Sequence, residues 1–111
     1  MALPASYSET EVQIFEAALK AFAQKGRDGA RMQEIADAAG INKAMLHYYF
    51  RSKDRLYEDV VGYVMRRFLG AFSEAMREAE TFGDTLRAFV RTYIEIIGQN
   101  PDVFRLIAQE N

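Results

Sequence analysis

The chain has 111 residues and a net charge of -2, and half of its residues are hydrophobic, which is typical of one folded domain rather than of a disordered or fibrous chain. It contains no cysteine and only one histidine, so the sequence excludes disulfides and thiolate metal sites, and we expect no metal ion and no cofactor. Residues 1–6 lack the features of a signal peptide and no segment is long and apolar enough to span a membrane, so we expect no membrane partner.

The first predicted helix begins near residue 9 and ends at a glycine. Ser8 and Glu11 have the spacing of a capping box, in which each side chain accepts from the backbone N–H of the other residue. The apolar residues that follow recur at helical spacing and give one buried face: Val12, Phe15, Ala18, Leu19, Phe22 and Ala23. Gly26 ends the helix, because glycine readily takes the left-handed conformation just past a helix C-terminus.

Two short helices follow, separated by a glycine and an asparagine. The first stops at Gly40, and the second covers residues 43–49 with Asn42 as its N-cap. Ala36 is small where the two helices must approach each other, as a steep crossing requires. Leu46 points inward by periodicity, which leaves most side chains of the second short helix facing solvent or a partner.

The remaining sequence predicts one long helix and two further helices. Ser52 caps the long helix, whose apolar stripe continues to residue 79. A break then follows, and Asp84 starts the next helix. Asn100 and Pro101 begin the last one, since proline is favoured at the first helical position. No stretch alternates with a two-residue period, so we predict an all-α fold.

The negative net charge hides a difference between the two halves of the chain. Residues 1–55 hold eight lysines and arginines against seven acidic residues, whereas residues 56–111 hold six against nine. A DNA-binding surface needs cations that displace counterions from the phosphates. The charge distribution therefore favours the first half as a nucleic-acid-binding part, although its excess is a single charge.

The two short helices and their glycine corner have the spacing of a helix-turn-helix motif. Such a turn pushes the second helix outward, where it can enter the major groove of DNA. A lysine and a tyrosine on this helix suit phosphates, and the N-terminus of the next helix adds backbone donors. We therefore predict a DNA-binding domain at residues 1–52 and a helical regulatory and dimerisation domain, incomplete at its end, at residues 53–111.

The chain resembles the tetracycline-repressor (TetR) family of transcriptional regulators over about residues 9–60. The residues that carry the resemblance are Ile35, Ala36, Ala39, Gly40, Ile41, Lys43, Leu46, Tyr48, Tyr49, Phe50, Ser52 and Lys53. The resemblance implies a three-helix, homeodomain-like head, a long connecting helix, and part of a helical body that binds a small-molecule effector and forms a homodimer. The family's two late dimerisation helices are absent here, so we expect either a fragment of a longer protein or another dimer surface.

The resemblance also implies which residues contact double-stranded operator DNA. Carried over by position, they are Arg31, Gln33, Lys43, Ala44, Met45, His47, Tyr48 and Lys53. Arginine stands at position 31 where the family usually has threonine or serine, which favours a contact to a phosphate or a guanine edge over the usual cap.

Aromatic and methionine side chains on the later helices would line an effector pocket if the family comparison holds there. These residues are Phe68, Phe72, Met76, Phe89 and Tyr93. Core packing is the simpler role for each of them, because a Phe- and Met-rich stripe at helical spacing usually fills a core.

These features together predict a ligand-responsive repressor that binds a palindromic operator as a homodimer, in the cytoplasm and associated with the nucleoid. The alternative is a helical protein-interaction module without DNA binding, which the low net charge favours. An enzyme is not expected, because the sequence offers no recognisable nucleophile, base, phosphate loop or metal site.

Overall fold

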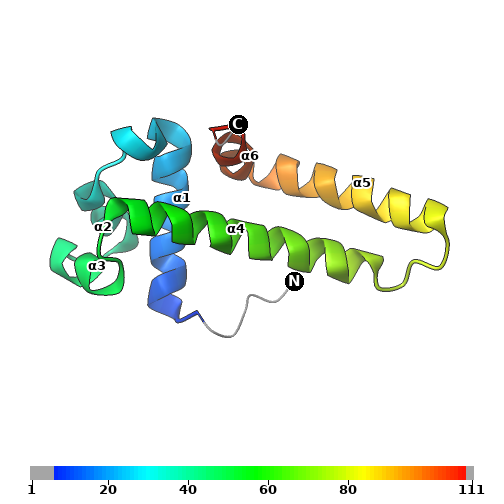
Figure 1. Cartoon of the computed structure of the whole chain (residues 1–111), viewed down its shortest axis with the longest axis horizontal. Helices are drawn as coiled ribbons and strands as arrows, with labels where there is room; N and C mark the ends of the chain where they lie inside the picture. Colours follow the sequence, from blue (N-terminus) through cyan, green and yellow to red (C-terminus); the bar gives the residue numbers. More distant parts are fainter. Residues whose placement is uncertain (1–6, 110–111) are drawn as a thin grey trace.

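The computed structural model describes residues 7–109, and within them it contains helices and no strand. The helices are α1 (Glu9–Gly29), α2 (Met32–Ala39), α3 (Lys43–Tyr49), α4 (Lys53–Met76), α5 (Phe82–Gln99) and α6 (Pro101–Gln109). In Figure 1, α1 to α3 form a head at one end, α4 leads away from it, α5 runs back beside α4, and α6 lies next to α1. The all-α prediction is confirmed.

Helix α1 begins with the predicted capping box. The backbone N–H of Glu11 donates to Ser8 Oγ at 3.1 Å, and the backbone N–H of Ser8 donates to Glu11 Oε1 at 2.9 Å. The prediction that the helix ends at Gly26 is only partly right. Gly26 interrupts the helix with φ 73° and ψ 172°, but a further helical turn continues to Gly29 before Ala30 caps it.

The core lies where α1 packs against α2, α4 and α6, and Leu46 of α3 is part of it. Its largest fully buried side chains are Tyr63, Phe22, Ile14, Ile35, Leu46, Leu56, Leu106 and Val60. They come from the head, from the first half of α4 and from α6, and one contiguous cluster contains all of them. The head therefore shares its core with the start of α4 and with α6, and the domain boundary at residue 52 stays a prediction.

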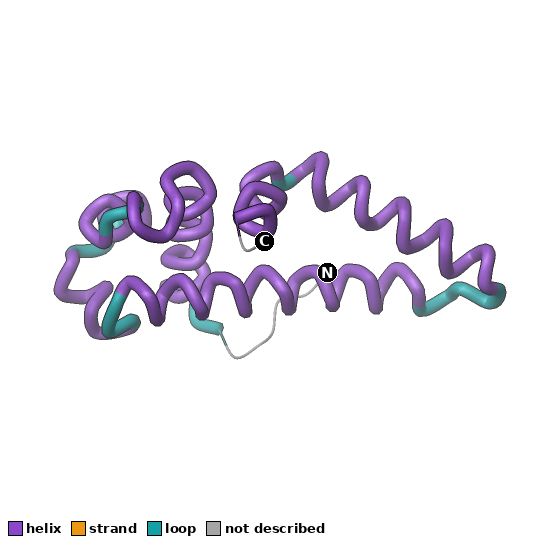
Figure 2. Tube along the Cα trace, turned by 45° about the horizontal axis from the view of Figure 1, so that its top comes forward, coloured by secondary structure: helices purple, strands orange, loops and turns teal. Residues whose placement is uncertain are grey.

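Helix α6 is bound to the middle of α1. Gln109 Nε2 donates to the backbone carbonyls of Phe22 and Ala23 at 2.9 and 3.1 Å, close to the interruption of α1 at Gly26. The tube in Figure 2 shows α6 lying between α1 and the end of α5. The last described residues of the chain thus contact the same helix on which the head is built.

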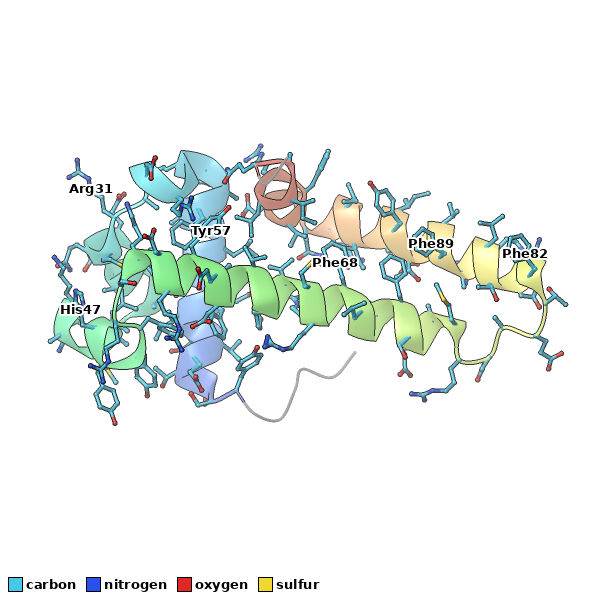
Figure 3. The ribbon with its side chains drawn as sticks, viewed as in Figure 1. Arg31, His47, Tyr57, Phe68, Phe82 and Phe89 are labelled. Atoms are coloured by element: carbon cyan, nitrogen blue, oxygen red, sulfur yellow. The ribbon has the colours of Figure 1, made fainter. Side chains whose placement is uncertain are left out.

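Helix α5 leaves most of its apolar side chains in solvent. Of its residues, all of which the structure describes, Ala88 and Thr92 are buried. Most of the larger apolar residues are exposed, whereas Ile96 and Ile97 are half-buried, and Phe82 is 81% exposed at the far end of the molecule (Figure 3). The exposed apolar face of α5 consists of Phe82, Leu86, Phe89, Val90, Tyr93 and Ile94.

The start of α5 was predicted at the wrong residue. Thr81 caps the helix, because its Oγ1 accepts from the backbone N–H of Asp84 at 3.0 Å, so Asp84 lies in the first turn instead of beginning the helix. The carboxylate of Asp84 accepts from Arg87, which holds the pKa of Asp84 below its ordinary value. Threonine and aspartate both favour helix N-termini, so the local pattern fits either start.

The described residues contain neither a membrane-spanning helix nor a cluster of metal ligands. None of the helices within residues 7–109 is long and apolar enough to cross a membrane. The same residues contain no group of three or more histidine, aspartate or glutamate side chains able to hold a metal ion.

Tyr63 lies buried at the crossing of α1 and α4. Its ring stacks on Phe15 at 4.8 Å, and the guanidinium of Arg67 lies 5.5 Å from its centroid. The pKa of the Tyr63 hydroxyl is raised to about 12, first by burial and then by the neighbouring carboxylate of Glu16, whose effect is larger than the lowering by Arg67. The neutral phenol is therefore the form that this site stabilises.

The raised pKa of Tyr63 predicts a loss of stability at alkaline pH. Below about pH 10 the Tyr63 hydroxyl is protonated in both the folded and the unfolded state, so its contribution to the free energy of unfolding is constant. Between about pH 10 and 12 only the folded state keeps this proton. The free energy of unfolding should therefore fall with pH across this range, and Tyr63→Phe should flatten the fall. Urea unfolding at several pH values measures both slopes. Tyr48→Phe, at an exposed site, is the control, and an equal flattening there would contradict the assignment.

Candidate nucleic-acid interface

The corner between α2 and α3 is built by a left-handed glycine. Gly40 has φ 75° and ψ 26°, and its N–H donates to the carbonyl of Asp37 at 3.2 Å. The N–H of Ile41 donates to the carbonyl of Ala36 at 3.0 Å, which ends α2 in a compact C-terminal turn. Asn42 Oδ1 then accepts from the N–H of Met45 at 2.7 Å and starts α3. The predicted glycine corner and asparagine cap are confirmed.

Helix α3 is held by the buried Leu46 and the half-buried Tyr49, and its other side chains are exposed. Among its seven residues, all of which the structure describes, only Leu46 is buried. Tyr48 is 80% exposed, and four more side chains of α3 are exposed. The exposed predicted contact residues on this helix are Lys43, Ala44, Met45, His47 and Tyr48. The stick view shows His47 at the outer edge of the head (Figure 3).

The start of α2 adds two more predicted residues to this end of the molecule. Arg31 is the N-cap of α2 and its exposed side chain projects from the head (Figure 3). Gln33 is exposed, and its Nε2 donates to Asp37 Oδ1 at 2.9 Å, one turn further along α2. The amide of Gln33 is therefore oriented within the helix before any partner binds.

A salt bridge ties α1 to α2 beside these residues. The ammonium of Lys25 donates to the carboxylate of Glu34 and, as the first cause, holds the pKa of that carboxyl below its ordinary value; the charge of Arg31 lowers it further. Both partners are largely exposed, so the pair adds little stability and mainly compensates the acidic side chain next to the interface.

Lys53 differs from the other predicted contact residues, because its ammonium is bound within the chain. Its Nζ donates to the backbone carbonyls of Asp28 and Ala30, each at 3.1 Å, and its side chain is half-buried. The N-cap Ser52, whose Oγ accepts from the N–H of Arg55 at 3.1 Å, agrees with the sequence prediction. Sequence reasoning missed the contact to α1, since residues 28 and 53 are brought together only by the fold.

Three of the five predicted effector residues, Phe68, Phe72 and Phe89, form a row of stacked rings between α4 and α5. Phe68 and Phe72 stack at 6.3 Å between ring centroids, and Phe72 and Phe89 stack at 4.7 Å (Figure 3). Met76 is half-buried, whereas Tyr93 is exposed. The row joins the two helices by ring contacts, and its role in ligand binding stays a prediction.

A cleft of about 660 Å³ lies beside this row and reaches the head. Of the five predicted effector residues, all of them described, Phe68 lines it. Its polar lining residues come from α1, α4 and α5 and from the residue before α6, and they are Glu16, Arg67, Glu74, Thr92, Glu95, Gln99 and Asn100. These residues were missed, because no local pattern marks polar side chains from distant helices as neighbours.

The geometry of α1, α2 and α3 defines a helix-turn-helix head, and comparisons with known proteins agree. The family model of the bacterial regulatory proteins of the tetR family matches residues 14–60. The chain is 34% identical to the HTH-type transcriptional regulator RutR of Escherichia coli (strain K12) over 97 residues, which cover 87% of this chain and 45% of RutR. It is 31% identical to the HTH-type transcriptional activator FasR of Mycolicibacterium smegmatis over 103 residues, 93% of this chain and 47% of FasR.

A solved structure supports the same conclusion for the fold. The crystal structure of a TetR-like transcriptional regulator from Rhodococcus sp. RHA1 superposes with a TM-score of 0.86 at 25% identity, over 99% of this chain and 59% of that one. The chain matches the tetR family of bacterial regulatory proteins over residues 14–60, the helix-turn-helix head and the start of α4. It spans about half the length of the curated relatives it matches.

Proposed function

We propose that this chain is the DNA-binding part of a transcriptional regulator, with α3 as the helix that enters the major groove. The observation that carries the proposal is that α3 exposes five side chains suited to DNA while one leucine anchors it to the core. A helix held in this way presents its outer face to a groove without disturbing the head. An electrophoretic shift with random-sequence duplex at low salt tests binding, and selection from a random DNA pool then finds the operator.

The operator is palindromic and is bound by two copies of the chain, one head on each half-site. One head alone buries too little surface for tight, specific binding, and two heads about 34 Å apart meet the same face of DNA. Support for pairing comes from the exposed apolar face of α5, because large apolar side chains gathered on one exposed helix suit a contact with another protein surface. Sedimentation of the chain with and without operator measures the number of copies bound.

Base recognition comes from Lys43 and Gln33. Lys43 lies at the exposed start of α3, and the exposed amide of Gln33 is held by a hydrogen bond to Asp37 on α2. Replacing either residue by alanine should change the base preference at one operator position by about 1 to 3 kcal/mol. Binding assays on single-base operator variants measure this. Arg105→Ala on α6 is the control, and a uniform loss at all positions would contradict a base contact.

The regulator is a ligand-responsive repressor of the cytoplasm, where its operator lies in the nucleoid. The cleft supports a small-molecule effector, because its lining joins α1 of the head to α4 and α5, so a bound molecule would touch both parts. FasR is named a transcriptional activator, so activation is the outcome that the test must separate from repression. Transcription from a selected operator, with and without the chain, decides between repression and activation.

A helical protein-interaction module is the second candidate function. It is favoured by the net charge of -2 and by the exposed apolar face of α5, both of which suit a protein partner better than DNA. The electrophoretic shift separates the two functions, since an interaction module gives no shift with any duplex even at low salt.

A further inference from the structure

Lys53 joins the first turn of α4 to the end of α1. Two hydrogens of its ammonium are used by the carbonyls of Asp28 and Ala30, each at 3.1 Å. Lys53 is half-buried, in contrast to Arg31 and Lys43, whose side chains are exposed in the same head. Of these three cations, Lys53 is the one that the fold has already bound to its own backbone.

The carbonyls that Lys53 binds are ones that the end of α1 leaves without helical partners. The last carbonyls of a helix accept no intrahelical hydrogen bond and carry the negative end of the helix dipole. Here the final turn is also irregular, because Gly26 interrupts α1 and Ala30 caps it in an extended conformation. An ammonium at this point satisfies both carbonyls and complements the dipole.

Two further contacts hold the same turn. The guanidinium of Arg27 lies 5.0 Å from the ring centroid of Tyr57, one turn along α4, and this ring packs edge-on against Phe22 at 5.0 Å (Figure 3). Helix α2 starts at Met32, directly after the turn, and α3 follows α2 through Gly40. The direction of both helices therefore depends on how residues 27–30 sit against α4.

We propose that Lys53 is a positioning residue for DNA binding, which clamps the turn between α1 and α2 onto the start of α4 and is not one of the cations that neutralise phosphates. The proposal rests on the function proposed above. It revises the DNA contact of Lys53 that the family resemblance implies. The two roles differ in their salt dependence, because each phosphate neutralised by a cation steepens the dependence of log K on log salt by about 0.9, whereas a positioning residue leaves this slope unchanged.

The test compares the full chain with Lys53→Met and Lys53→Gln. Methionine removes the charge and the donors, while glutamine removes the charge but keeps an amide that donates toward the same carbonyls. Binding of a pool-selected operator duplex is measured across a salt series, and hydrogen exchange of residues 27–33 is measured without DNA. Arg55→Met is the matched control, since it removes a charge two residues along α4, where Arg55 pairs with Asp59 at 3.5 Å.

Lys53→Met should weaken binding about tenfold at every salt concentration, the loss expected for two hydrogen bonds, with a slope parallel to that of the unmodified chain. Exchange in the turn should become faster. Lys53→Gln should recover part of the operator affinity and part of the protection from hydrogen exchange. Arg55→Met should leave hydrogen exchange in the turn unchanged. If circular dichroism shows that Lys53→Met does not fold, the slope of log K against log salt is measured on Lys53→Gln instead.

Two results would overturn the proposal in distinguishable ways. If the slope of log K against log salt is shallower by about 0.9 in both Lys53 variants and hydrogen exchange of residues 27–33 is unchanged, Lys53 contacts a phosphate and the proposal is wrong. An unmodified chain that binds no duplex overturns the proposed function itself, and with it a role for Lys53 in binding, whatever the exchange rates show.

Discussion

Leu46→Ala should lower the free energy of unfolding by about 2 to 5 kcal/mol and abolish operator binding. Leu46 is fully buried and is the one buried residue of α3, whereas Tyr49 is only partly buried against the core. A helix of seven residues is not stable without tertiary contacts. The loss is large against the roughly 5 to 15 kcal/mol that stabilises a typical domain. Urea unfolding followed by circular dichroism measures the stability, and fluorescence anisotropy with labelled duplex measures the binding.

Tyr48→Ala on the same helix separates anchoring from contact. Tyr48 is exposed, so its removal should change the free energy of unfolding by no more than about 0.5 kcal/mol while still weakening DNA binding. If Leu46→Ala kept both the stability and the affinity of the unmodified chain, the anchoring of α3 through one leucine would be wrong.

Gly40→Val should reduce both stability and DNA binding, with the larger effect on binding. A non-glycine residue in the left-handed region costs about 1 to 2 kcal/mol, and a β-branched side chain is among the least tolerated there. A Cβ at position 40 meets no atom within 4 Å, so the cost comes from the backbone conformation alone. Relief of this strain requires a change in φ at the corner, which reorients α3 relative to α2. Urea unfolding and operator binding of the variant measure the two effects.

Two variants control the Gly40 prediction. Gly40→Asn should retain most of the binding, because asparagine tolerates the left-handed conformation better than other residues. Gly98→Ala lies in α5, where a Cβ also meets no atom within 4 Å but φ is not positive, and it should keep or raise stability by up to about 1 kcal/mol. Equal losses for Gly40→Asn and Gly40→Val would show that conformation at the corner is not what matters.

The helix boundaries that depend on neighbouring residues were predicted well. The capping box of Ser8 and the caps at Asn42 and Ser52 follow from side chains that bond three residues along the chain, and the glycine corner follows from the backbone conformation that Gly40 can adopt. The start of α5 was wrong because Thr81 and Asp84 offer equivalent local signals. A local pattern fixes a boundary only where a single residue has the required chemistry.

The contacts between distant residues were not predictable in this way. The sequence pattern predicted a contact surface on α3 from periodicity, and the exposure of Lys43, His47 and Tyr48 agrees with that surface. It gave no indication that Lys53 would bind the end of α1 or that Gln109 would bind its middle. The spacing of polar residues along the sequence does not indicate which distant residue each of them will bond.

For this protein the sequence alone determined the all-α class, the order of the helices and the outward face of α3, because helix caps and apolar periodicity act over a few residues. Tertiary structure decided which helix ends meet, which residues line the cleft, and that α5 leaves an apolar face in solvent. The reason is physical: these features depend on the packing of helices far apart along the chain, and a buried face does not specify which neighbour buries it.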